Sequence, residues 1–148
     1  MILPIIKSLV LALNANNDSF EFSFGPEAWN NLLADESVFP KVHLDSPLIT
    51  KYLPAQGGYI GEKYPIKLFF MYKSQLEWLP EEHEKEAVDK ANTAIRQFIT
   101  RCQDSPLIDE IEIGQDAVEF INLLDVNVSG KLLFITLKPN INLSVCIT

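Results

Sequence analysis

The sequence is poor in the residues that build most metal and redox sites. Its 148 residues include only two cysteines and two histidines. Two cysteines cannot form a disulfide framework or a four-ligand zinc site. With 6 glycines and 9 prolines, the chain also lacks a collagen-like or low-complexity composition. These shortages exclude several small structural and metal-binding classes before any motif is considered.

Positive charge is also scarce. Twelve basic residues against twenty acidic ones leave a formal net charge of −8. This balance disfavours a nucleic-acid-binding protein, because neutralising phosphates requires clustered lysine and arginine. A hydrophobic content of 47% and a charged content of 22% exclude a disordered chain and predict one globular domain over residues 1–148.

The apolar N-terminal stretch up to Leu13 is too short for a membrane span, which needs about 20 apolar residues. Lys7 lies inside it and no basic segment precedes it, so a signal peptide is disfavoured. We expect a short buried helix over about residues 4–13, with Pro4 near its first turn. Cys102 and Cys146 are interpreted as free thiols in a reducing compartment, and no membrane partner is expected.

Three segments have the apolar alternation of β-strands. Phe20, Phe22 and Phe24 fall on one face of the first strand, and the second spans Val38 to Leu44, with Pro40 marking an edge strand or a later start. The third, residues 59–73, has apolar residues on both faces, so we expect a central strand that is covered on both sides, with Pro65 a possible interruption. Residues 45–58, between the second and third strands, are interpreted as a long loop.

The second half predicts a helix and a hairpin. Apolar residues between Ala87 and Cys102 form a single helical stripe, which predicts a long helix over about residues 80–103. Two strands over about residues 118–138, with a two-residue turn at Ser129-Gly130, predict a β-hairpin, and residues 139–148 form a C-terminal arm. The element order predicts an α+β fold, a small antiparallel sheet flanked by helices.

No motif carries clear catalytic or metal-binding chemistry. His83 lies in an acidic first helical turn, which we expect to be solvated, and Ala87 stands where a zinc-protease helix needs its second histidine. The segment from Asp125 to Gly130 begins like a calcium loop, but Thr136 occupies the position of the bidentate acid. A cation-dependent enzyme would need acids that converge on His43 or Asp125. We therefore expect no enzyme activity, cofactor or metal.

Two charged groups have plain alternatives to a binding role. Leu107 to Ile113 predicts a short strand after the long helix. The acids of this region are better explained as a solvated loop than as a cation site; they are Asp104, Asp109, Glu110 and Glu112. The aromatic residues near four lysines are better explained by core and interface packing than by base stacking; these lysines are Lys51, Lys63, Lys67 and Lys73.

Three segments together resemble a known family. They are Gly57-Gly58-Tyr59-Ile60 with Tyr64 to Trp78, the helix end Arg96-Gln97-Phe98-Ile99-Thr100-Arg101, and the hairpin Asp125 to Leu132. Over roughly residues 37–146 the chain resembles small neck and tail proteins of tailed bacteriophages, such as those of Bacteroides and crAss-like phages. The element order is similar to the tail-terminator or tail-completion fold.

The resemblance implies a non-enzymatic virion protein that forms a homo-oligomeric ring at the head–tail junction or tail end. It implies neck, portal or tail proteins as partners, assembly in the bacterial cytoplasm, and a channel in which genomic DNA passes close by. Such rings join through sheet edges, loops and arms. The expected subunit contacts are Leu53, Tyr59, Leu143, Val145 and Ile147. A soluble binding module for a small molecule or peptide, with a cleft between sheet and helix, is the alternative.

Overall fold

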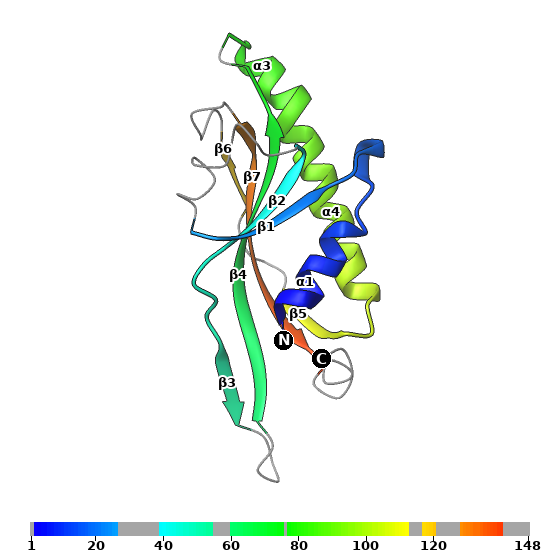
Figure 1. Cartoon of the computed structure of the whole chain (residues 1–148), viewed down its shortest axis with the longest axis vertical. Coiled ribbons are helices and arrows are strands. Elements are labelled where there is room, and N and C mark those ends of the chain that lie inside the picture. Colours follow the sequence, from blue (N-terminus) through cyan, green and yellow to red (C-terminus); the bar gives the residue numbers. More distant parts are fainter. Residues whose placement is uncertain are drawn as a thin grey trace.

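The fold was analysed in a computed structural model, which describes residues 2–26, 39–54, 60–75, 77–112, 117–120 and 128–140. Within these residues, seven strands form one sheet and the helices lie on one of its faces (Figure 1). The elements in chain order are α1 (Ile2–Leu11), η1 (Ala15–Asn17), β1 (Glu21–Gly25), β2 (Lys41–Asp45), β3 (Lys51–Pro54), β4 (Ile60–Lys73), α3 (Pro80–His83), η3 (Glu84–Val88), α4 (Asp89–Asp104), β5 (Ile108–Glu112), β6 (Ala117–Phe120) and β7 (Val128–Pro139).

Two long antiparallel strands, β4 and β7, form the centre of the sheet, and each carries two shorter strands along its outer edge. On the outer edge of β4, β2 pairs with residues 68–71 and β3 pairs with residues 60–63. On the outer edge of β7, β6 pairs with residues 130–133 and β5 pairs with residues 136–139. β1 lies outside β2 and is parallel to it. The α+β class is confirmed. The sheet is nevertheless larger than expected, with seven strands, and it is mixed because β1 and β2 are parallel. Fifteen residues, 26–40, separate these strands in the sequence, which is enough to join a parallel pair.

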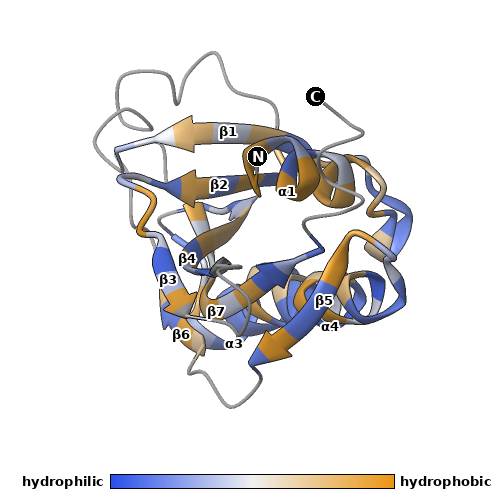
Figure 2. Ribbon diagram, turned by 90° about the horizontal axis from the view of Figure 1, so that it is seen from below, coloured by the Kyte–Doolittle hydropathy of each residue, from blue (hydrophilic) through white to orange (hydrophobic). Residues whose placement is uncertain are grey.

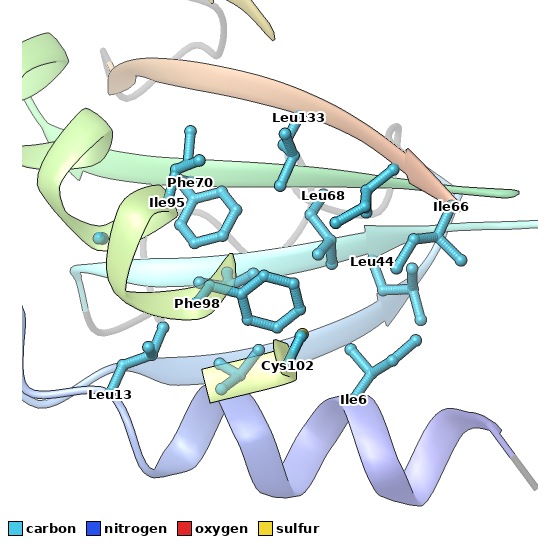
Figure 3. Packing of buried hydrophobic residues seen from close by; sticks show 14 of the residues in the cluster. Ile6, Leu13, Leu44, Ile66, Leu68, Phe70, Ile95, Phe98, Cys102 and Leu133 are labelled. Carbon is cyan, nitrogen blue, oxygen red and sulfur yellow. The ribbon is translucent and has the colours of Figure 1, made fainter. Parts of the chain in front are cut away.

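The main core lies between the sheet and the helices. α3, η3 and α4 run on continuously from Pro80 to Asp104, close to the predicted range, with η3 as a π-helical segment. Their apolar stripe meets the face of β4 that carries Leu68 and Phe70, and the rings of Phe70 and Phe98 pack edge to face (Figure 3). The N-terminal helix is confirmed, although it begins at Ile2 and ends at Leu11, and it buries Ile6 in the same core.

The helix-free face of β4 carries a second, smaller core. Phe69, Met71 and Val128 are buried there, and three partly buried residues pack against them, namely Phe39, Phe120 and Leu132. The prediction of a strand covered on both faces is therefore confirmed for the second half of β4, around Phe69 and Met71. The strand also continues through Pro65, which pairs with Thr136 of β7. On the other edge of β4, neither β2 nor β3 pairs at that position, so a proline interrupts no ladder there.

The predicted turn at Ser129-Gly130 is wrong, since both residues lie inside β7. β6 and β7 are antiparallel neighbours, as expected of a hairpin, but β6 covers only Ala117–Phe120. Gly130 serves close packing instead: a Cβ atom there would lie 1.9 Å from the carbonyl oxygen of Phe70. The glycine that suggested a turn is needed where two backbones approach each other.

The predicted loop over residues 45–58 is partly wrong, because it contains β3. Lys41 pairs with Met71 and Lys51 pairs with Lys63, so the eleven residues 41–51 lie alongside the nine residues 63–71 of β4. β2 and β3 thus follow one edge of β4 with a short irregular break. Together β3 and the start of β4 form a two-stranded arm that extends past the helices (Figure 1).

Candidate self-assembly surface

The arm places exposed side chains at one edge of the sheet. Tyr52 is 68% exposed on β3, and Ile49 just before it is 57% exposed. At the base of the arm, the Tyr64 hydroxyl donates a 2.7 Å hydrogen bond to Oε2 of Glu62. Burial and this carboxylate raise the pKa of Tyr64 to about 12. The base of the arm is therefore well packed while its outer edge is open.

The far edge of the same part of the sheet is β5. We call this part the distal strip: β3, residues 60–66 of β4, residues 134–139 of β7, and β5. Seen from below in Figure 2, β3 and β5 lie on opposite sides of it. Among the described residues, β3 pairs only with β4 and β5 pairs only with β7, so the distal strip has two open edges.

Charge divides the distal strip into a basic and an acidic side. The Lys63 ammonium donates a hydrogen bond to Oε1 of Glu112, which crosses β7 and ties the arm to β5. This contact raises the pKa of Lys63 and lowers the pKa of Glu112. Lys51 stands beside Lys63 on the arm, while Asp109 and Glu110 are exposed on β5. The two outer edges of the strip therefore differ in charge, with Lys51 on the β3 edge, Asp109 and Glu110 on the β5 edge, and the Lys63–Glu112 pair between them.

A groove of about 300 Å³ runs beside β5, between that strand and the end of α4. Its lining residues are Cys102, Gln103, Ile108, Asp109, Glu110 and Ile111. Burial raises the pKa of the Cys102 thiol to about 12, so Cys102 is a packed apolar group there and not a nucleophile.

Of the contact residues predicted from the sequence, the structure places Leu53 on the arm, where it is half-buried opposite Gly61. The other four predicted contacts stay predictions, because they lie outside the described residues; they are Tyr59, Leu143, Val145 and Ile147. Asp125 and Cys146 also lie outside the described residues. Sequence reasoning missed Tyr52 and Lys51, because a four-residue strand gives too short an alternation. The acids of β5 are not on a loop as expected, whereas the short strand predicted over Leu107 to Ile113 is confirmed by β5, with one irregular position in its register.

Both histidines are packed inside the fold. Nδ1 of His43 lies 2.6 Å from the Ser23 hydroxyl, and Nε2 lies 2.8 Å from the Gly25 carbonyl oxygen. The ring therefore accepts from Ser23 and donates to Gly25, and burial lowers the pKa of His43. His43 is therefore a buried histidine with a hydrogen-bond partner on each ring nitrogen.

The expectation that His83 is solvated is wrong, since it is only 3% exposed. Its Nδ1 atom lies 3.2 Å from the Ser129 hydroxyl, which donates to Ser74, and the Trp78 ring packs on it edge to face. His83 of α3 thus meets Ser129 near the start of β7, so this turn of the helix faces the sheet and not solvent. Ser129 is fully buried, and the His83–Ser129 pair is a structural link between helix and sheet.

A second hollow, of about 260 Å³, lies between the sheet and the helix. Its lining residues are Asp18, Phe39, Pro40, Tyr72, Lys73, Trp78, Glu86 and Lys90. The Tyr72 hydroxyl donates to Asp18 and accepts from Asn16, and Lys90 pairs with Glu86. These polar groups are thus already engaged with one another. Burial raises the pKa of Tyr72, so its hydroxyl stays neutral.

The part of the chain that the structure describes holds neither a cluster of metal ligands nor a helix that could span a membrane. No three of its histidine, cysteine or acidic side chains come together as ligands would. None of its helices has the length and hydrophobicity that a bilayer crossing requires.

The chain was compared with known families and with curated proteins. No family model matches it, and no curated protein matches it.

Proposed function

We propose that this protein is a non-enzymatic structural subunit of a tailed bacteriophage virion that assembles into a ring at the head–tail junction or tail end. The observation that carries the proposal is the distal strip, with different open edges on its two sides. Two unlike edges favour head-to-tail association, which closes into a ring when the rotation between copies closes. The resemblance to neck and tail proteins supplies the phage context.

The exposed arm supports an assembly role. An open edge with an exposed tyrosine is a liability for a protein that stays monomeric, since unpaired strand edges pair with other chains. Tyrosine is also enriched at protein interfaces. In a virion, the open strand edge and the exposed tyrosine would let the arm bind a neighbouring subunit.

The charge of the chain suits a ring around a channel. A net charge of −8 repels the DNA backbone, whereas a basic lining would bind it and slow its passage. Neighbouring portal, neck or tail proteins are the proposed further partners. The proposed location is the virion, after assembly in the host cytoplasm, and no cofactor is needed.

Electron microscopy of the purified chain tests this function. We expect closed rings with a central hole at high protein concentration. Single copies at all concentrations, or open filaments without closure, would contradict the ring.

The hollow beside Tyr72 is the observation in favour of the alternative, a module that binds a small molecule or peptide between sheet and helix. A library of small polar and aromatic compounds, screened by thermal shift, tests it. A compound that stabilises the wild-type chain but not the Trp78→Ala variant would favour the binding module, and no such compound would count against it.

A further inference from the structure

We propose that β3 of one copy pairs in antiparallel fashion with β5 of the next copy, so that the distal strips of neighbouring subunits form one continuous sheet. Lys51 of one copy then lies beside Glu110 of the other, and Tyr52 enters the groove beside β5. This inference rests on the proposed ring and names the contact that builds it.

Strand direction supports this pairing. β3 is antiparallel to β4, β4 to β7, and β7 to β5, so β3 and β5 run in opposite directions. When copies stand side by side with the same orientation, β3 of one therefore meets β5 of the next in antiparallel order. The alternation of directions continues across the boundary without a break, and each open edge supplies the backbone groups that the other needs.

Charge and face agree with the pairing. Lys51 lies directly opposite Lys63, and Lys63 reaches Glu112, so these three side chains share the helix-free face of the sheet. Glu110 lies two residues before Glu112 and shares that face. Within a single copy Lys63 pairs with Glu112, and the same carboxylate attracts Lys51. A glutamate from the next copy beside Lys51 would add a second attraction at the exposed edge.

The helix side of the strip provides the matching apolar contact. Tyr52 follows Lys51 in the strand, so its side chain is on the opposite face, the one that carries the helices. The groove beside β5 is on this side too, because Cys102 and Gln103 of α4 line it. One tyrosine ring, exposed in the single copy, thus faces a groove of suitable size on the next.

Charge exchange tests the contact between Lys51 and Glu110. Lys51→Glu and Glu110→Lys should each weaken self-association about tenfold or more per interface, because each turns an attraction into a repulsion. The double variant should restore association toward the wild-type value. Lys85→Glu, an exposed lysine on η3, is the matched control and should have no effect. Unchanged association in both single variants would overturn the inference.

Directed cross-linking gives a second test that does not depend on the strength of association. In a Cys146→Ser background, Lys51→Cys and Glu110→Cys proteins are prepared separately and then mixed under oxidising conditions. We expect disulfide-linked dimers only in the mixture. If rings form but the mixture gives no cross-link, this contact is wrong while the proposed function stands; if the wild-type chain stays monomeric, the proposed function itself fails.

Discussion

At the scale of single residues, close packing explains positions that the sequence assigns to other roles. Gly130 was assigned to a turn and His83 to solvent, yet both lie where a helix or a strand presses on the start of β7. Such contacts join residues far apart in the chain, and no local pattern reveals them. The role of Gly130 leads to a direct prediction.

Gly130→Ala should destabilise the protein by about 2 kcal/mol or more, because the new methyl group must displace the Phe70 backbone. Gly61→Ala is the matched control, since its Cβ would make ordinary contacts of 3.7 to 3.9 Å. Urea unfolding followed by circular dichroism measures both. Equal stability of the two variants would contradict the account of Gly130.

His43 predicts a dependence of stability on pH. The folded chain holds its imidazole neutral and lowers its pKa, whereas the unfolded chain binds a proton near the ordinary value of 6.5. Stability should therefore be complete above that value and should be lost as the pH falls toward the lowered pKa. The charged neighbours are Lys41, which lowers the pKa further, and Asp45, which raises it.

His43→Gln keeps a donor and an acceptor but cannot titrate. The decrease in unfolding free energy between about pH 7.5 and pH 5 should be smaller in this variant than in the wild type. Chemical unfolding at each pH gives the comparison. Parallel curves for the two proteins would show that His43 does not contribute.

At the scale of elements, strong periodicity was enough to predict the main parts. The stripe of the long helix and the two-sided apolar pattern of β4 each predicted an element and its burial. β3 was missed because it has only four residues, and the parallel pairing of β1 with β2 could not be read from either strand alone. Of the assembly surface, only Leu53 and the general region of residues 45–58 could be anticipated.

The N-terminal helix lies outside the family resemblance, but the structure shows that it completes the core. Ile6→Ala should cost about 3 kcal/mol of unfolding free energy, since Ile6 is fully buried among the sheet and α4. Leu11→Ala, at a position that is 53% exposed on the same helix, should change stability little. Thermal and urea unfolding measure both variants. Equal losses of stability would show that α1 is peripheral and not part of the core.

At the scale of the whole molecule, the two faces of the sheet differ in what covers them, and the two edges of the distal strip differ in charge. The helices cover one face, the second half of β4 has a small core on the other, and the distal strip carries Lys51 on one edge and Asp109 and Glu110 on the other. The asymmetry between these edges makes head-to-tail contact between copies the natural mode of association. The sequence alone could not show this, because the edges come from β3 and β5, which are far apart in the chain.

Sedimentation velocity over a wide range of protein concentration tests self-assembly most directly. The account predicts that the wild-type chain forms one discrete species of several copies, and that Lys51→Glu shifts its formation to higher concentration. A wild-type chain that remains a monomer at every concentration would contradict the central claim.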